Sequence, residues 1–408
     1  MGPGAGRTVS PLFPHLFLQP PAVGVGDGDW KPALRSEVAL RRARGEAPRR
    51  PLRSLFVAAG ARGGEASLGR NVLEVVGSDV VGSATEWTVE IEVPGTGIPF
   101  SLAVIRAWGD AGVNRVSLAP SPTCPSTAVS DGVQTAAPFE VRLESLMAST
   151  RRLLSSGIPV VSVDISLPTG RDQARKGMEQ ALRTAQALER IGVPQLAIRE
   201  FGGWEDVEEA QGEDGSAEGE DGSKDDPEWG SEVVPKLTAG QAAGVEDDGE
   251  SWAGLRDCLL GAGYESGDGI HFSRRGPPAL HSRAILRREP VLGLGPAAVT
   301  FRNPERRANV REWQGYRRQA LAGLDPLEWQ ERLSREEVRT ERVWSRLRSR
   351  EGLRTGGMGL RSTRLIREWV VREWATVKGG RVVLLPEGWV RMDGLVVDLL
   401  RTGDLDRG

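Results

Sequence analysis

Cysteine is nearly absent from this chain of 408 residues, which contains only Cys124 and Cys258. Two cysteines so far apart in the sequence do not form the disulfide framework typical of small secreted proteins. They also cannot supply the three thiolates that a tri-cysteine iron–sulfur site requires. The cysteine count therefore excludes both of these classes.

Long apolar runs are missing as well. No stretch of about 18 apolar residues is present, which excludes a transmembrane helix of ordinary length. The opening segment MGPGAGRTVSPLFPH lacks the apolar core of a signal peptide. The formal net charge is −3, so no global field draws the protein to nucleic acid or to a membrane. We therefore expect a soluble cytoplasmic protein with no membrane span.

Lysine and histidine are scarce, and nearly all the positive charge is arginine. The histidines are His15, His271 and His281, which leaves few candidates for imidazole chemistry. The arginine excess fits a GC-rich coding bias better than selection for the fork-shaped guanidinium.

The sequence does contain an alternation of strands and helices between residues 52 and 201. The expected strands are 52–59, 86–93, 112–118, 159–165 and 195–201, and the expected helices are 100–110, 139–155 and 172–191. Strands separated by helices of this length imply βαβ units and a parallel sheet. These units are too few for a complete eight-fold barrel, so we predict an α/β fold with a partial (β/α) barrel.

A composition change divides the chain. The segment around GEDGSAEGEDGSKDDPEWGSE is acidic, rich in Gly and Ser, and nearly free of apolar residues, which predicts a disordered insertion. The predicted parts are an N-terminal strand and loop (1–50), a β/α domain (51–202), the acidic insertion (203–251), a continuation of the core (252–301) and a C-terminal domain (302–408).

The last hundred residues are expected to be mainly helical. Ser334 and Glu337 have the spacing of a capping box, which predicts a helix from there to residue 350 that Gly352 ends. A second helix (362–375), a short strand (381–385) and a final helix from Pro386 are expected to follow. This order resembles a small winged-helix module.

One segment resembles a known family. Residues 16–30, LFLQPPAVGVGDGDW, are similar to the first strand and loop of the HemW/HemN family. That family comprises radical-SAM haem chaperones and oxygen-independent coproporphyrinogen oxidases, and its segment reads L-Y-I-H-I-P-F-C-x-x-x-C-x-x-C. In this alignment Val23, Asp27 and Trp30 occupy the three cysteine positions.

Further segments resemble the same family in the same order, over residues 16–202 and 252–400. They are LFVAAGAR (55–62) at the family's GGGTP turn, EWTVEIEVPGT (86–96), WGDAGVNRVSL (108–118), VSVDISLP (161–168) and VLGLGP (291–296). The resemblance implies a radical-SAM-type partial barrel with a HemN-like C-terminal domain. It also implies S-adenosylmethionine and a [4Fe–4S] cluster as cofactors.

The cluster's ligands are missing from this chain. Val23 and Trp30 have no suitable donor atom, and Asp27 alone cannot replace three soft thiolates. We therefore predict that the cluster is absent and assign no catalytic residue or metal ligand.

The resemblance implies a vestigial S-adenosylmethionine pocket at Gly60, Glu90, Glu92 and Asp164. Each residue also has a structural interpretation: a tight turn for Gly60, a solvent-facing strand position for the glutamates, and a helix cap or arginine pair for Asp164. Arg62 is a candidate contact for a carboxylate or phosphate, or part of the same turn.

His281 is the candidate haem contact, because imidazole can ligate haem iron and the family's chaperone branch binds haem. Nearby arginines 283, 287 and 288 can pair with haem propionates. An exposed or structural histidine is the alternative. Haem, or a haem-receiving protein, is thus a possible partner.

Two further patterns are assigned structural roles. The glycines of LGLGP lack a following Lys-Ser/Thr, so a tight turn fits better than a phosphate loop. The Arg- and Trp-rich segment RLIREWVVREW is interrupted by Glu368 and Glu373, and tryptophans at helical spacing usually belong to a core. We therefore expect no nucleic-acid binding.

Three functions remain open. The first is a HemW-like protein of haem or porphyrin metabolism without radical-SAM catalysis, with a haem-binding or chaperone role. The second is a catalytically inactive scaffold or regulatory protein. The third is a working oxygen-independent coproporphyrinogen oxidase, which the missing thiolates disfavour.

Overall fold

The computed structural model describes residues 13–21, 25–46, 48–93, 97, 100–120, 138–168, 174–201 and 246–405. Val23, Cys124 and most of the predicted acidic insertion at 203–251 lie outside these residues. None of the helices in the described ranges is both long enough and apolar enough to cross a membrane.

A large open sheet forms the centre of the molecule. Its parallel strands are, in spatial order, β9 (Val291–Leu294), β1 (His15–Leu18), β2 (Ser54–Gly60), β3 (Glu86–Val93), β4 (Arg115–Pro120), β5 (Val160–Pro168) and β6 (Gln195–Phe201). Antiparallel strands extend both edges: β10 (Val299–Arg302), β11 (Glu305–Asn309) and β12 (Leu327–Arg332) beyond β9, and β8 (His271–Ser273) and β7 (Glu265–Ser266) beyond β6. The predicted α/β fold with a mainly parallel central sheet is confirmed.

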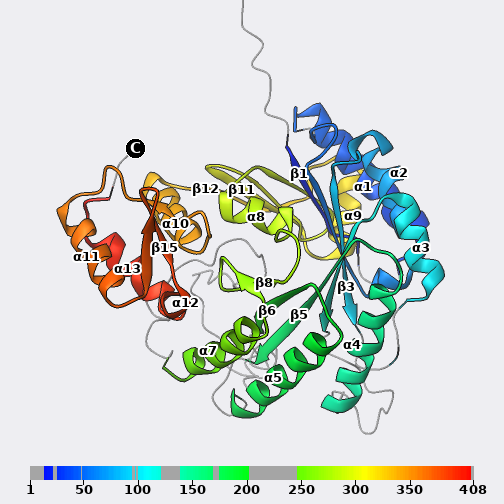
Figure 1. Ribbon diagram of the computed structural model, residues 1–408. Helices are drawn as coiled ribbons and strands as arrows, with labels where there is room; N and C mark the ends of the chain where they lie inside the picture. The colour runs from blue at the N-terminus through cyan, green and yellow to red at the C-terminus, as the bar shows by residue number, and fades with distance from the viewer. Residues whose placement is uncertain are drawn as a thin grey trace, which may run out of the picture.

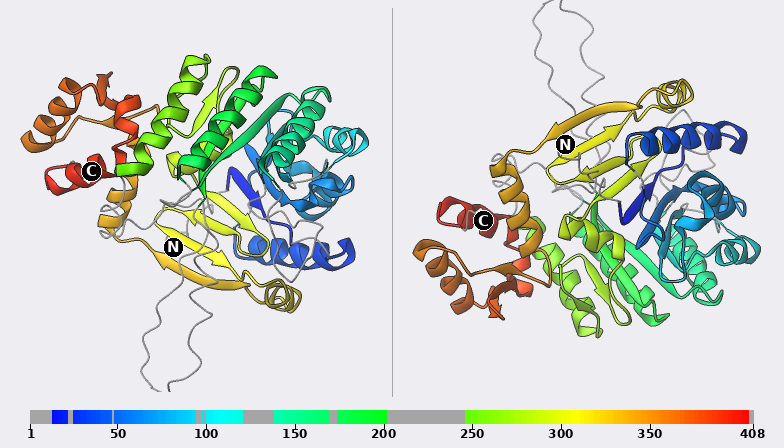
Figure 2. Two further views of the ribbon diagram at one scale, coloured as in Figure 1. Left: turned by 90° about the horizontal axis from the view of Figure 1, so that it is seen from below. Right: turned by 90° about the horizontal axis from the view of Figure 1, so that it is seen from above.

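Helices cover the outer, convex side of the parallel strands (Figures 1 and 2). They are α1 (Asp27–Ala43), α2 (Leu68–Val76), α3 (Leu102–Ala111), α4 (Phe139–Leu154), α5 (Ala174–Arg190) and α7 (Glu246–Gly261), with short 3-10 turns η1 (Ala61–Gly64) and η2 (Ser78–Val80). Helix α9 (Trp313–Leu321) packs on α1.

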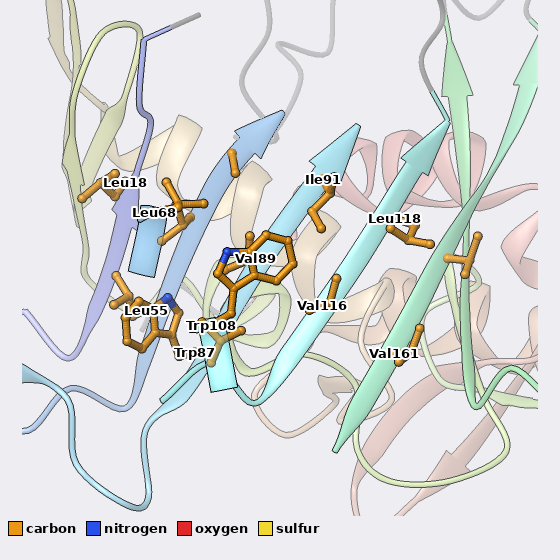
Figure 3. Close-up of a cluster of buried hydrophobic side chains, with 14 of the residues drawn as sticks. Leu18, Leu55, Leu68, Trp87, Val89, Ile91, Trp108, Val116, Leu118 and Val161 are labelled. Atoms are coloured by element: carbon orange, nitrogen blue, oxygen red, sulfur yellow. The ribbon is translucent and has the colours of Figure 1, made fainter. Parts of the chain in front are cut away.

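Strand β3 has an apolar outer face and a polar inner face. On β3, Trp87, Val89 and Ile91 are buried against the helices, and Figure 3 shows these side chains beside Leu68 and Trp108 from α2 and α3. The residues between them point to the opposite face, because successive strand side chains alternate. On β3 the concave inner face of the sheet, here called the lumen, therefore carries the polar residues Thr88, Glu90 and Glu92.

The LGLGP segment ties the first helix to the sheet. Gly295 has φ +101°, and a Cβ there would lie 2.0 Å from the carbonyl oxygen of Gln19, so only glycine fits. Its backbone N–H donates to the buried carboxylate of Glu37 at 2.9 Å. The same carboxylate accepts from Arg41 at 3.0 Å and from the Tyr316 hydroxyl at 2.7 Å. This turn is structural, in agreement with the interpretation made from the sequence.

The C-terminal module has its own hydrophobic core and lies to one side of the sheet (Figures 1 and 2). Its elements are α10 (Arg335–Leu347), β13 (Leu353–Arg354), α11 (Leu360–Val371), β14 (Ala375–Lys378), β15 (Arg381–Leu384), α12 (Pro386–Trp389) and α13 (Met392–Arg401). The three strands form a small antiparallel sheet in the order β13-β15-β14. The predicted helices and the strand near 381–385 are present, but β13 and β14 were not predicted, and α11 ends at Val371 rather than at 375.

Several element boundaries differ from those read in the sequence. The capping box of Ser334 and Glu337 is present, but its helix ends at Leu347. Strands β11 and β12 lie within 302–408 yet belong to the large sheet, and the second core begins at Val343. Their charged sequences, ERRAN and LEWQER, lack the apolar pattern by which edge strands are recognised.

Candidate functional site

The candidate site is the lumen near the carboxyl ends of β3, β5 and β6. Arg199 projects into it from β6 and pairs with two carboxylates from other strands. Its Nη2 lies 3.0 Å from Oε2 of Glu90 on β3, and its Nε lies 2.6 Å from Oδ2 of Asp164 on β5. Asp164 is 1% exposed, so its charge depends on this partner. One guanidinium therefore links two of the predicted site residues.

A second charged layer lies deeper in the lumen. Glu86 on β3 is 3.8 Å from Arg115 on β4, and Arg115 also donates to the side chain of Gln195 on β6. Burial raises the pKa of the Glu86 carboxyl, which Arg115 partly offsets. Burial likewise lowers the pKa of Arg115. The backbone N–H of Leu280 donates to Glu86 at 2.6 Å and joins this layer to the next helix.

That helix, α8 (Leu280–Arg287), closes the lumen from the inner side. His281 on α8 is 3% exposed, and its ring stacks on Phe56 and Phe17 with centroid distances of 4.7 Å and 5.7 Å. A haem iron cannot reach this ring unless the stack opens. The predicted haem contact remains untested, but the alternative of a structural histidine agrees with this placement.

Between α8 and the strands remains a cavity of about 30 Å³. Its lining includes Ser162, Asp164, Arg199, His271 and Ser282. A space of this size holds one or two water molecules rather than a cofactor.

Gly60 and Glu92 lie together at the open end of the lumen. Gly60 has φ +52°, and a Cβ built there would lie 3.9 Å from Oε2 of Glu92. The structure therefore groups the predicted residues into two neighbouring sets, Gly60 with Glu92 and Glu90 with Asp164. His281 lies apart from both, in the aromatic stack.

The loop at the cluster position is held by Arg62. This side chain is 2% exposed and donates to the carbonyl oxygens of Pro21, at 2.6 Å, and of Val25. It also pairs with Glu65 at 2.8 Å. The structural interpretation of Arg62 thus agrees with its contacts, since its nitrogens bind the chain itself.

The residues at the three cysteine positions do not fit a [4Fe–4S] cluster. Trp30 is fully buried in the hydrophobic core, and Asp27 begins helix α1. Two cysteines in the whole sequence cannot provide three thiolates. Within the described residues, no group of three or more His, Cys, Asp or Glu side chains is arranged to hold a metal ion.

The sequence reading did not include Arg199 or His271 in the site. Nδ1 of His271 lies 2.7 Å from Oδ2 of Asp268, which orients the ring beside the cavity. The signal for Arg199 was present in QLAIREF, where Gln195, Ala197 and Arg199 alternate with buried Leu196 and Ile198. Alternation of this kind places the arginine on the inner face.

The fold is an open, partial α/β barrel followed by a small winged-helix-like module. The charged residues of the site lie on the inner face of this barrel, near the carboxyl ends of its parallel strands. Among solved structures this chain is similar to the coproporphyrinogen III oxidase HemN from Escherichia coli, described as a radical-SAM enzyme. The TM-score is 0.62 at 12% identity, and the match covers 95% of this chain and 91% of that one. The chain therefore has a HemN-like fold.

Other comparisons add little. A phosphonopyruvate hydrolase matches 47% of this chain and 59% of its own length at 15% identity, with a TM-score of 0.23 that carries no weight. No protein-family model and no curated protein sequence matches the chain.

Proposed function

We propose that this protein is a cytoplasmic, HemN-like protein of haem or porphyrin metabolism that has no radical-SAM activity and acts as a scaffold or regulatory partner. The observation that carries the proposal is the ion pairing of Arg199 with Glu90 and Asp164. The shortage of cysteine thiolates supports it independently.

The carboxylates of the lumen are already paired with a cation of the chain, which disfavours binding of a cationic cofactor. S-adenosylmethionine carries positive charge on its amino group and its sulfonium, which carboxylates can bind. Here the chain supplies that positive charge itself, through a guanidinium that donates a charge-assisted hydrogen bond to Glu90 and forms an ion pair with Asp164. A cationic ligand has to displace Arg199 before it can pair with Glu90 and Asp164.

The test is anaerobic reconstitution with iron and sulfide, followed by calorimetric titration with S-adenosylmethionine. We expect no stoichiometric cluster absorbance at roughly 400 nm, where iron–thiolate charge transfer absorbs, and no saturable binding heat. A Cys124→Ser/Cys258→Ser variant is the matched control for iron bound adventitiously by thiols. A stoichiometric cluster in the wild type, or saturable binding that Glu90→Gln abolishes, contradicts the proposal.

Haem binding is the second candidate, because the Phe17–His281–Phe56 stack combines an imidazole with an apolar surface. We expect His281→Ala and the wild type to give the same Soret spectrum on haem titration, since the ring is held in the stack. A Soret shift in the wild type that is lost in His281→Ala, but kept in His271→Ala, supports a haem-binding role instead of a scaffold.

A further inference from the structure

The C-terminal module exposes one long face of helix α11. Ile366 and Trp369 bury the opposite face in the second core. Arg361, Arg364 and Arg367 are exposed, and the side chain of Arg364 is 85% exposed. At this spacing the three guanidinium groups occupy about two turns of one helix surface.

The tip of the β14–β15 hairpin lies at the same end of the module as the start of α11. Thr355 follows β13 and donates to the carbonyl oxygen of Gly380 at the tip, from its backbone N–H at 3.0 Å and from its hydroxyl at 3.1 Å. The chain reaches α11 five residues later, at Leu360. Arg354 and Lys378, both exposed, lie next to this contact in the chain, on β13 and β14.

Charge is segregated into this module. Residues 335–405 contain fifteen Arg and Lys against ten Asp and Glu, a net charge of +5 in a chain whose net charge is −3. The C-terminal module is therefore basic, although the net charge of the whole chain is negative. Local positive potential of this kind attracts phosphate backbones.

We propose that this face of the module binds duplex nucleic acid, with α11 facing a groove and the hairpin tip contacting neighbouring phosphates. A helix beside a hairpin can engage a groove and its flanking strand together. Guanidinium groups match phosphate oxygens in geometry as well as charge. This inference is independent of the lumen and goes beyond the proposed scaffold role.

The acidic residues near this face do not cancel it. Oε1 of Glu368 is 3.5 Å from Nε of Arg364, an exposed pair that solvent weakens. Asp404 accepts from the backbone N–H groups of Arg361 and Ser362, so its carboxylate caps the helix. Glu373 is exposed just beyond the end of α11. The expectation of no nucleic-acid binding rested on Glu368 and Glu373, and the binding experiment decides between that expectation and this proposal.

The test is fluorescence anisotropy of the full-length protein with a labelled 20-base-pair DNA of random sequence. We expect a dissociation constant of roughly 10⁻⁶ M at low salt, and about a 100-fold loss between 50 and 200 mM salt if about four phosphates are neutralised. The Arg361→Ala/Arg364→Ala/Arg367→Ala variant should lower the slope of log affinity against log salt by about three.

The matched control changes the same number of exposed arginines on the barrel helices: Arg106→Ala on α3, Arg151→Ala on α4 and Arg190→Ala on α5. This variant should bind DNA like the wild type, and circular dichroism should show both variants folded. No binding at 50 mM salt, an equal loss in both variants, or equal binding to poly-glutamate overturns the proposal; the last result indicates an acidic protein partner.

Discussion

At the scale of single residues, arginine and histidine side chains in and beside the lumen contact other groups of the chain itself. Arg62 binds backbone carbonyls, Arg199 joins two carboxylates, and the ring of His281 fills an apolar gap. His15 has the same character. Its Nδ1 lies 2.7 Å from Oγ of Ser54 and its Nε2 lies 2.9 Å from Oε2 of Glu289.

His15 should make folding stability depend on pH. Burial lowers its pKa below the ordinary value of 6.5, and this effect exceeds the opposing influence of Glu289. The unfolded chain then binds a proton as pH falls below 6.5 while the folded chain does not, so acid favours unfolding. We expect the contribution of His15 to the free energy of unfolding to be constant well above pH 6.5 and to decrease from there toward the folded-state pKa.

Urea titrations at pH 7.5, 6.5 and 5.5 measure this dependence. The decrease should be smaller in His15→Asn, whose amide does not titrate. The control His271→Asn should retain the decrease due to His15. An unchanged pH profile in His15→Asn rules out this residue as its source.

At the scale of elements, strands that are far apart in the sequence pair with each other where their backbones come close together. Strand β1 lies between β2 and β9 although β9 begins at Val291. The LGLGP segment then passes close to the end of β1, where the N–H of Gln19 donates to the carbonyl oxygen of Leu294 at 2.8 Å. Two glycines make this approach possible, because a Cβ on Gly293 would meet the Val299 carbonyl oxygen at 2.4 Å.

Substitution of Gly295 in this turn should strongly lower the free energy of unfolding. Gly295→Ala combines positive φ with a Cβ 2.0 Å from the Gln19 carbonyl oxygen, so we expect a loss of more than about 3 kcal/mol in the free energy of unfolding. Gly323→Ala is the matched control, because φ is +69° there but nothing lies within 4 Å. It should cost only about 1 kcal/mol, the strain of the left-handed backbone. Equal losses in urea unfolding contradict the role of close approach.

The element boundaries show how far the sequence is informative. Strands β3 and β6 match the predicted ranges residue for residue, because their alternating or apolar patterns are strong. Within the segment 1–50 the sequence pattern predicts only a short helix over 36–44. Helix α1 begins earlier, at Asp27, since Trp30, Ala33 and Leu34 bury a face that the Pro-containing sequence obscured. Local pattern identifies an element more reliably than it identifies its ends.

At the scale of the whole molecule, ion pairs join the two hydrophobic cores. Glu341 on α10 of the module pairs with Arg288 at the end of α8 and, at 3.2 Å, with Arg306 on β11. All three side chains are at most 10% exposed. Burial, together with Arg306, lowers the pKa of Arg288 to about 10. The carboxylate of Glu341 is thus shared by two guanidinium groups, and the pair of Arg256 with Glu387 at 2.8 Å is a second contact between the two parts.

Removal of that carboxylate should loosen the module. Glu341→Gln removes the anion that pairs with Arg288, while Arg306 keeps its pair with Glu331. We expect a loss of about 3 kcal/mol in the free energy of unfolding, because Arg288 is then a buried cation without that carboxylate. Scanning calorimetry should then show a separate, earlier transition for residues 335–405. Glu336→Gln, at an exposed position on the same helix, is the matched control and should melt like the wild type. A single transition at the wild-type temperature in Glu341→Gln disproves this coupling.

The sequence alone determined the alternation of strands and helices, the capped helix that opens the C-terminal module and the shortage of thiolates. The first two depend on local patterns of residues, and the third on a residue count. Only the tertiary structure decided that Arg199 lies between Glu90 and Asp164, that His281 is stacked in the lumen, and that β9 pairs with β1. These contacts join residues from separate strands and helices. The register and curvature of the sheet bring them together, and neither can be read from a single segment of sequence.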